Sequence, residues 1–350
     1  MFTTLFRRRI FFVGLCLYFL STASAIPPPD AQKPLQIYFV DVEGGQASMF
    51  VTPAGQSLLI DTGWADFGGR DADRIVAAAK DAGLKKIDFV LLTHYHLDHA
   101  GGLPQLVAKI PIGAFIDHGE NREPSEATRQ VWQDYLNAVA QQNLKRSTAK
   151  PGDALPLQGI ETKVISSDGA VIADSLPGAG AANASCKNAP QPPADSSENP
   201  RSVGTLFTFG KLRILDLGDL TADKEMLLMC PANKLGVVDV YIVSHHGSVT
   251  SNSPLFLNGI APRVAIMDNG ATKGGAPSSW DAIEKSPRLE DLWQLHFSDG
   301  SDAHNVQEPF IANLSGPDAG NYLKLSAWPD GNFEIFNSRT KTTKRYASAQ

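Results

Sequence analysis

Four side chains that can bind a metal ion lie close together in the first third of the chain. They are His94, His96, Asp98 and His99, and they directly follow the apolar run 89–92. Imidazole nitrogens and carboxylate oxygens suit Zn²⁺ and neighbouring divalent ions. Alternate residues of an extended segment face the same side, so His94 and His96 can share one ion, while Asp98 and His99 begin a turn and can reach a second. The spacing therefore predicts a metal site with room for two ions.

A solvent-exposed histidine-rich loop is the alternative explanation of this segment. The glycine pair Gly101 and Gly102 and the apolar run before the histidines are instead typical of a strand-to-helix turn that forms a site.

Two later segments carry similar side chains at the ends of apolar runs. Asp219 follows residues 212–217, and the pair His245 and His246 follows residues 237–243. A nearly continuous apolar run of this length is typical of a strand buried on both faces. Asp219 could also simply cap the helix that follows it.

Strands and helices are expected to alternate in both halves of the chain, which indicates an α/β sandwich. Strands are expected at 35–40, 47–52, 57–61, 89–92, 112–117, 205–209, 212–217, 237–243, 292–297, 322–328 and 332–336, and helices at 71–82, 103–109, 126–143 and 222–229.

The histidine motif has the form HxHxDH and, together with residues 35–42 and 57–63, resembles the metallo-β-lactamase superfamily. Within that superfamily the similarity is to the hydrolase domain of the ComEC type of competence protein, over most of residues 35–337. The resemblance implies a four-layer αβ/βα sandwich with metal ions at the edge of the two sheets.

The resemblance also assigns roles at the site. It implies two divalent metal ions, with Zn²⁺ expected and Mn²⁺ or Fe as alternatives. Asp219 would bridge the ions, because two dications roughly 3.5–4 Å apart repel each other. Asp61 would orient the histidine motif by hydrogen bonds. The register favours His245 over His246 as the last ligand. The metal ligands are then His94, His96, Asp98, His99, Asp219 and His245.

The sequence departs from the family pattern at three places. A further histidine of many members is replaced by residues 198–202, which resemble the Asn and Ser motif of the ComEC type. Residues 42–46 differ from the usual DVGQGD run, and residues 274–277 lack a histidine that often precedes the proline. Without that further histidine, the first metal ion would be held by His94, His96, Asp219 and solvent. The departures at 42–46 and 274–277 concern the substrate rather than the metal chemistry.

The site predicts a hydrolase that uses hydroxide formed from metal-bound water, because zinc lowers the pKa of that water to about 7. A phosphodiester or related ester is the expected substrate. The alternatives are an amide, lactam or lactone hydrolase on the same scaffold, and a non-catalytic metal-binding protein. Asp98 or Asp219 would hold the nucleophile. The candidates for substrate or leaving-group contacts are Asn199, Ser202, His246 and Ser248.

The N-terminus has the pattern of a secretory signal peptide, expected at 1–25. Three arginines at 7–9 precede the apolar run 10–20, and the small residues 23–25 follow it. An uncleaved anchor is the alternative, but this run is short for a bilayer of about 30 Å. The mature protein is expected in the periplasm or outside the cell, with residues 26–350 as a single domain.

Residues 170–200 are rich in Gly, Ala, Ser, Pro and Asn and are expected to form a flexible loop. Processing would leave Cys186 and Cys230 as an even pair. They can form a disulfide in an oxidising compartment, or remain two free thiols.

The net charge of −6 would become more negative on loss of the three N-terminal arginines. Such a chain has no general attraction to nucleic acid or anionic lipid, so a small-molecule substrate is favoured over a nucleic acid. The closing basic residues are expected to be a solvated tail: Arg339, Lys341, Lys344 and Arg345.

Overall fold

The computed structural model describes residues 33–65, 67–316 and 318–349. Lys33–Gln350 form one compact unit. The expected signal peptide, residues 1–25, lies outside the described residues. Within the described part of the chain, no helix has the length and apolar character needed to cross a membrane.

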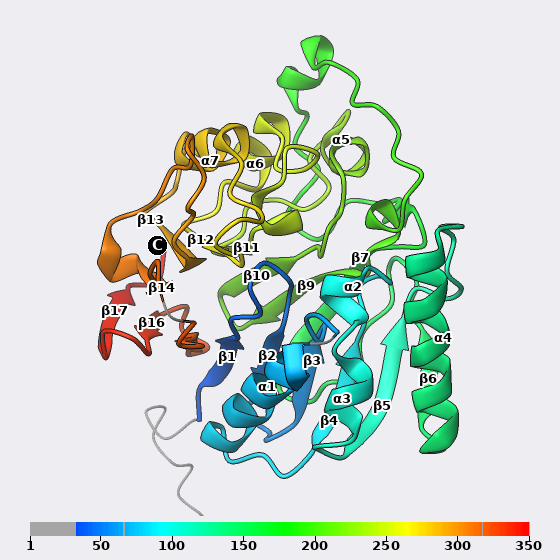
Figure 1. Cartoon of the computed structure of the whole chain (residues 1–350). Coiled ribbons are helices and arrows are strands. Elements are labelled where there is room, and N and C mark those ends of the chain that lie inside the picture. Colours follow the sequence, from blue (N-terminus) through cyan, green and yellow to red (C-terminus); the bar gives the residue numbers. More distant parts are fainter. Residues whose placement is uncertain (1–32, 66, 317, 350) are drawn as a thin grey trace, which may run out of the picture. The chain divides into compact units, whose positions relative to one another are not determined.

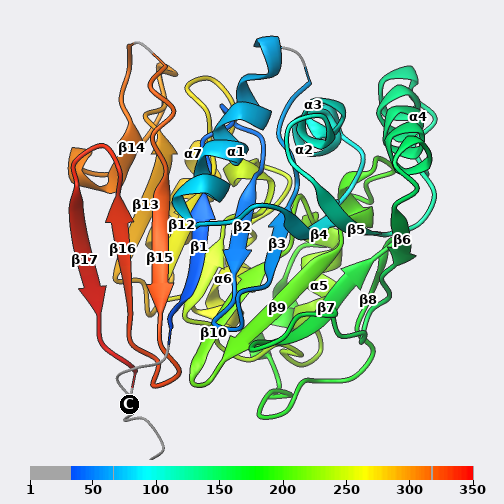
Figure 2. The ribbon, with the colours of Figure 1, turned by 90° about the horizontal axis from the view of Figure 1, so that it is seen from below.

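Two β-sheets lie face to face in the middle of this unit (Figure 1). The first sheet has the strand order β17-β16-β15-β1-β2-β3-β4-β5-β6, which Figure 2 shows across the view. Its strands are β1 (Leu35–Phe39), β2 (Ser48–Val51), β3 (Ser57–Ile60), β4 (Ile87–Leu91), β5 (Ile112–Asp117), β6 (Lys145–Thr148), β15 (Leu323–Ala327), β16 (Phe333–Asn337) and β17 (Thr342–Tyr346).

The second sheet has the order β14-β13-β12-β11-β10-β9-β7-β8. Its strands are β7 (Glu161–Ser167), β8 (Ala170–Val171), β9 (Gly204–Phe209), β10 (Leu212–Asp216), β11 (Val240–Ile242), β12 (Val264–Met267), β13 (Asp291–His296) and β14 (Ile311–Asn313). Strands β3 to β6 pair in parallel in the first sheet, and β10 to β14 do so in the second. The turns that follow β4, β10 and β11 carry the predicted metal ligands.

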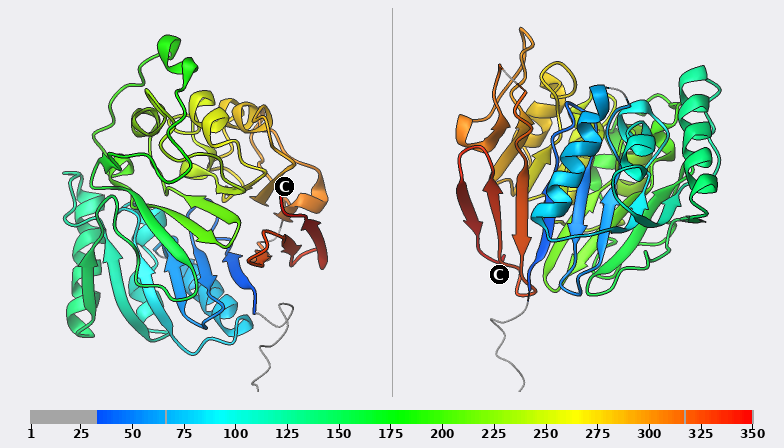
Figure 3. Two further views of the ribbon diagram at one scale, coloured as in Figure 1. Left: turned by 180° about the vertical axis from the view of Figure 1, so that it is seen from behind. Right: turned by 60° about the horizontal axis from the view of Figure 1, so that its bottom comes forward.

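Helices cover the outer face of each sheet (Figure 3). The first sheet carries α1 (Arg70–Asp81), α3 (Leu103–Val107) and α4 (Glu126–Gln141), and the second carries α5 (Ala222–Met229), α6 (Pro254–Ile260) and α7 (Pro277–Glu284). The short helix α2 (Leu97–Ala100) begins inside the histidine motif. The layers helix, sheet, sheet and helix are those of the αβ/βα sandwich, so the fold prediction is confirmed.

The apolar residues between the sheets form the main core of the unit. Phe50 on β2 and Phe207 on β9 are fully buried there, and their rings stack with centroids 4.3 Å apart. This core holds the two sheets together and so determines how the turns at their ends face each other.

The C-terminal basic segment is a strand rather than the solvated tail expected from its charge. Residues 342–346 form β17, which pairs with β16 at the edge of the first sheet. Lys344 and Arg345 are exposed there. Charged side chains on an edge strand discourage pairing with other chains, which gives the cluster a structural role.

Residues 170–200 follow a defined course with little regular structure, and their flexibility stays a prediction. They contain β8, η3 (Ala184–Asn188) and η4 (Asn199–Arg201). Cys186 on η3 forms a disulfide with Cys230 at the end of α5, so the two cysteines pair.

Replacing Phe207 by Ala is expected to lower the free energy of unfolding by about 3–5 kcal/mol, because it leaves a cavity between the sheets. Phe207→Leu keeps more of the volume and is expected to cost clearly less. Chemical denaturation followed by circular dichroism measures both. Equal losses in the two variants would contradict a tightly packed contact at this position.

Candidate metal centre

Three turns at the ends of strands bring the predicted ligands together (Figure 1). The histidine motif, residues 94–99, follows β4 of the first sheet. Asp219 follows β10 of the second sheet, and His246 follows β11 in η5 (Ser244–Gly247). The site therefore takes donors from both sheets.

Four buried side chains form what we call the deep cluster: Asp98, His99, Asp219 and His246. Nε2 of His99 lies 3.1 Å from Nε2 of His246. It lies 3.3 Å from Oδ2 of Asp98 and 3.2 Å from Oδ1 of Asp219. Nε2 of His246 is 3.1 Å and 3.5 Å from the same two oxygens. Donor atoms at about 2.0–2.1 Å around a tetrahedral zinc ion are about 3.3 Å apart. The donor spacing thus fits one ion.

A second group, the outer cluster, consists of His94, His96 and Asp219. Nε2 of His94 lies 3.0 Å from Nδ1 of His96 and 3.7 Å from Oδ2 of Asp219. Nε2 of His96 contacts a carboxylate oxygen of Glu123 at 3.0 Å, which leaves its Nδ1 facing the cluster. His245 flanks this group, with Nε2 3.5 Å from Oδ2 of Asp219.

The carboxylate of Asp219 belongs to both clusters. Its Oδ1 faces His99 and His246, and its Oδ2 faces His94 and His245. The side chain is buried, and Oδ1 accepts no hydrogen bond from the described residues. A carboxylate with one oxygen directed at each donor group is suited to bridging two cations.

The structure places His246, and not the expected His245, in the deep cluster. Both residues have left-handed backbone conformations, with φ of 54° and 52°. The chain therefore leaves the strand direction before the histidines, and alternation along β11 no longer decides which imidazole faces inward. His245 instead places Nδ1 3.0 Å from the hydroxyl of Thr250.

Asp61 supports the histidine motif as the resemblance implies. Its carboxylate accepts hydrogen bonds from the backbone N–H of Thr93 at 2.8 Å and from the Thr93 hydroxyl at 2.6 Å. It also contacts Nδ1 of His99 at 2.7 Å. A proton on Nδ1 leaves the lone pair of Nε2 directed at the deep cluster, as in most metal-binding histidines.

Asp268 has a similar position behind His246, and sequence reasoning missed it. It directly follows β12, is buried, and places Oδ1 3.3 Å from Nδ1 of His246. Its position after an apolar strand of the second sheet resembles that of Asp219, and this pattern was the available signal.

Burial and mutual contact shift the pKa values of these groups. Burial disfavours the charge on Asp219, but His245 and the neighbouring imidazoles hold the pKa of this carboxyl well below its usual range. Burial, with His99 and His96 nearby, lowers the pKa of His94 well below 6.5. Burial also opposes the charge on His99, but the surrounding carboxylates raise its pKa well above 6.5. A cation in the deep cluster would compete with the proton on His99.

Two of the proposed substrate contacts, Ser202 and Asn199, are buried. Ser202 is fully buried, and its hydroxyl accepts from the backbone N–H of Asp219 at 3.2 Å and lies 3.4 Å from Nδ1 of His94. It therefore contacts two candidate ligands, and its role toward substrate stays a prediction. Asn199 is buried in η4, and its role toward substrate, like that of Ser248, stays a prediction. His118, at the end of β5, contacts Glu198 at 2.8 Å in the interior.

Lys273 brings a positive charge to the deep cluster, which the sequence did not indicate. Its Nζ contacts the carboxylate of Asp98 and lies 4.9 Å from the ring centroid of Trp64. The side chain is about one-third exposed. It can therefore meet an anionic group that approaches from solvent.

A third group of potential ligands contains Asp41, Glu43, His296 and Asp318. Arg74 forms ion pairs with both Asp41 and Asp318. The arginine already supplies positive charge to this group, so we interpret it as an ion-pair network.

Residues 41–188 match the family model of the metallo-beta-lactamase superfamily. This stretch, less than half of the chain, is similar to the metallo-beta-lactamase superfamily. Recombination protein 2 of Haemophilus influenzae is 26% identical over 236 residues, which cover 67% of this chain and 24% of that protein.

Competence protein ComA of Neisseria gonorrhoeae is 27% identical over 231 residues, or 65% of this chain and 26% of that protein. Hydroxyacylglutathione hydrolase of Stenotrophomonas maltophilia is 37% identical over 81 residues, or 23% of this chain and 28% of that enzyme. The matches therefore span about a quarter of each relative. The competence protein agrees with the ComEC-type resemblance of the sequence.

Replacing His246 by Ala is expected to weaken the binding of one zinc ion by more than about 100-fold. Loss of a residue that only hydrogen-bonds to a metal ligand typically weakens metal binding by about 10- to 100-fold, and loss of a ligand should weaken it more. The reason is that one of four donors in the deep cluster disappears. His245→Ala keeps all four donors and is expected to retain that ion. Zinc content after dialysis against a weak chelator measures both. If His245→Ala loses the ion and His246→Ala keeps it, His245 is the ligand, as the sequence register predicts.

Proposed function

We propose that this protein is a metal-dependent hydrolase that holds two divalent ions, with Zn²⁺ as the preferred metal. The observation that carries the proposal is the carboxylate of Asp219, which directs one oxygen at each of two donor groups. The outer cluster would hold one ion and the deep cluster the other. When bound, such ions supply Lewis acidity and a water whose pKa is lowered to about 7.

The chain's own residues orient the donors and receive the substrate. Asp61 and Asp268 hold the imidazoles of His99 and His246 from behind, which keeps their Nε2 atoms directed inward. Lys273, beside Asp98, offers a positive charge to an anionic ester. Lysine is a common partner of phosphate oxygens.

A phosphodiester or related ester is the substrate class that these features favour. The local cation supports an anionic ester, and the ComEC-type resemblance points to the same class. The net charge of −6 favours a small molecule over a nucleic acid as the partner. We assign this activity to residues 26–350 as one hydrolase domain.

Export is part of the proposal. The basic, apolar and small-residue pattern of residues 1–25 supports it, and so does the Cys186–Cys230 disulfide, because disulfides persist mainly in oxidising compartments. Expression of the full chain, followed by fractionation and N-terminal sequencing, is expected to yield an exported protein that begins at Ile26. Recovery of the intact N-terminus from the cytoplasm would contradict export.

The zinc-loaded protein is expected to hydrolyse bis(p-nitrophenyl) phosphate, and to leave a chromogenic β-lactam and simple lactones unchanged. Removal of metal with a chelator should abolish turnover, and added Zn²⁺ or Mn²⁺ should restore it. Asp219→Ala is expected to lower kcat/KM by at least about 100-fold. Removal of a ligand shared by both ions should reduce activity more than removal of a residue that only hydrogen-bonds to a ligand, which typically costs about 10- to 100-fold.

Asp302→Ala, which removes an exposed carboxylate, serves as the matched control and should behave as the unmodified protein. Turnover of the lactam or lactones but not of the diester would favour the alternative hydrolase class. Tight zinc binding without turnover of any ester would instead favour a non-catalytic metal-binding protein.

A further inference from the structure

A proline-rich segment, residues 189–196, crosses the outside of the second sheet's helical layer between two fixed points. We call this segment the strap. Before it, Gly180 and Asn183 donate backbone hydrogen bonds to the carbonyls of Asn233 and Pro231, and the Cys186–Cys230 disulfide follows. These contacts attach the start of the strap to the end of α5.

After the strap the chain enters the metal centre. Glu198 donates its backbone N–H to Glu123, the residue that contacts His96. The carboxylate of Glu198 accepts from the backbone N–H of Tyr95, inside the histidine motif. The strap thus runs from a disulfide to the site itself. Its prolines restrict the backbone and favour a single course.

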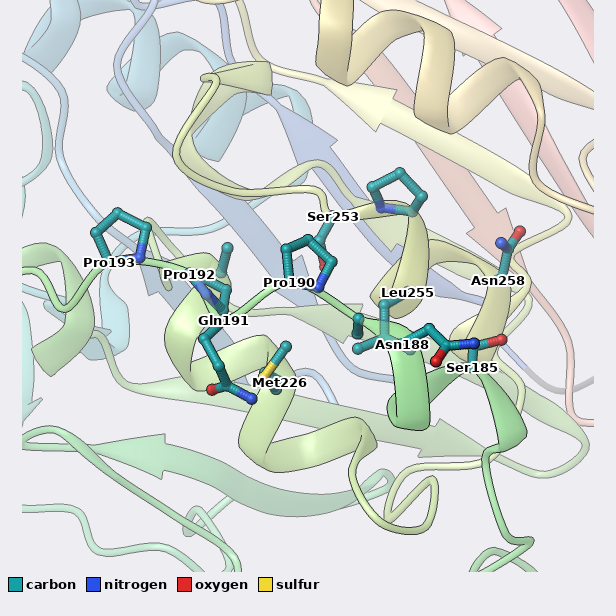
Figure 4. A pocket seen from close by; sticks show the side chains of 13 residues that line it. Ser185, Asn188, Pro190, Gln191, Pro192, Pro193, Met226, Ser253, Leu255 and Asn258 are labelled. Atoms are coloured by element: carbon teal, nitrogen blue, oxygen red, sulfur yellow. The ribbon is translucent and has the colours of Figure 1, made fainter.

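A cavity of about 670 Å³ lies between the strap and the helices α5 and α6. Figure 4 shows side chains from all three segments around it: Pro190 and Pro192 from the strap, Met226 from α5 and Leu255 from α6. This volume is in the range of about 300–1,000 Å³ that is typical of small-molecule sites. We call the cavity the strap groove.

The strap groove continues toward the metal centre. An adjoining cavity of about 460 Å³ shares Pro192, Pro193 and Ala222 with it and extends to Thr250. The hydroxyl of Thr250 lies 3.0 Å from Nδ1 of His245. Nε2 of His245 in turn lies 3.5 Å from the carboxylate of Asp219, the bridging residue. The adjoining cavity, which Asp195 also lines, therefore ends at a residue in contact with His245, and His245 is the neighbour of the bridging carboxylate.

The lining of the strap groove identifies the kind of group that fits it. The residues that line it are proline, alanine, leucine and methionine, with a few serine, asparagine and glutamine side chains, and none carries a charge. A polynucleotide would find no cation here to contact its phosphates. An alkyl or aryl group would instead leave water and contact apolar side chains. This transfer favours binding by roughly 0.8 kcal/mol for each buried CH₂ group.

We propose that the strap groove binds an uncharged, apolar arm of the ester substrate, while the ester group itself lies at the metal centre beside Lys273. The inference rests on the proposed hydrolase function and adds a substrate class to it, namely diesters with one long alkyl or aryl substituent. The strap groove, on the side of His245, selects diesters by the length of their apolar arm. Lys273, on the side of Asp98, contacts the anionic phosphate of the ester.

A series of p-nitrophenyl alkyl phosphates with methyl, butyl and octyl groups tests the inference on the zinc-loaded full chain. The ratio of kcat/KM for the octyl diester to that for the methyl diester is expected to be about tenfold or more, given up to about fourfold for each fully buried CH₂. Leu255→Trp narrows the groove from α6 and should bring this ratio close to one.

Ala222→Phe narrows the groove from α5 and provides a second variant in case the first folds poorly. Leu227→Trp is the matched control, because Leu227 lies next to Met226 on α5 but is 49% exposed and outside the groove lining. It should keep the full chain-length dependence. Thermal unfolding of each variant confirms that it is folded.

The outcomes separate the two proposals. If the unmodified protein hydrolyses the methyl diester and the octyl-to-methyl ratio of kcat/KM is near one, the strap groove does not bind the apolar arm. The proposed hydrolase function would still hold. If no diester is hydrolysed, the proposed function fails, and binding of the neutral fluorophore N-phenyl-1-naphthylamine then decides the groove. If the unmodified protein and Leu227→Trp bind the fluorophore but Leu255→Trp does not, the groove is supported as an apolar binding site. If the unmodified protein does not bind it, the groove proposal is overturned.

Discussion

The shared carboxylate of Asp219 is the interaction on which the centre depends. Asp219 follows a strand of the second sheet, whereas His94 and His99 follow a strand of the first. The two donor groups can therefore form only when the sheets pack face to face. The apolar core between the sheets, with the stacked rings of Phe50 and Phe207, provides that packing. Stability of the sandwich and geometry of the centre are thus coupled through the same interface.

Three residues of the metal centre have left-handed backbone conformations. Asp61, His245 and His246 all have positive φ values, although none is glycine. Such conformations cost free energy and persist only where surrounding contacts over-determine them. The hydrogen bonds of Asp61 to Thr93 and the close packing of Gly274 against the His246 backbone are contacts of this kind. These contacts hold Asp61 and His246 in place beside the deep cluster.

Charge and apolar surface occupy different sides of the proposed substrate site. Lys273 supplies a local cation next to Asp98, although the chain as a whole is acidic. The strap groove on the side of His245 has no charged lining. A substrate with one anionic centre and one apolar arm matches both features, whereas a polyanion matches only the first. The strap that forms the groove belongs to the part of the chain whose composition alone suggested only a loop.

The amino-acid sequence by itself determined the alternation of strands and helices and the histidine motif, because hydrophobic periodicity and ligand spacing are local properties. The four-layer sandwich and the grouping of Asp219 with the motif were implied by the resemblance to a known family. It also predicted α5 over 222–229 as the structure has it. Only the tertiary structure decided that His246 faces the deep cluster, since two left-handed residues reverse the expected register. The same is true of Asp268 behind His246 and of the basic segment in β17. Those positions depend on contacts between residues far apart in the chain, which local patterns do not encode.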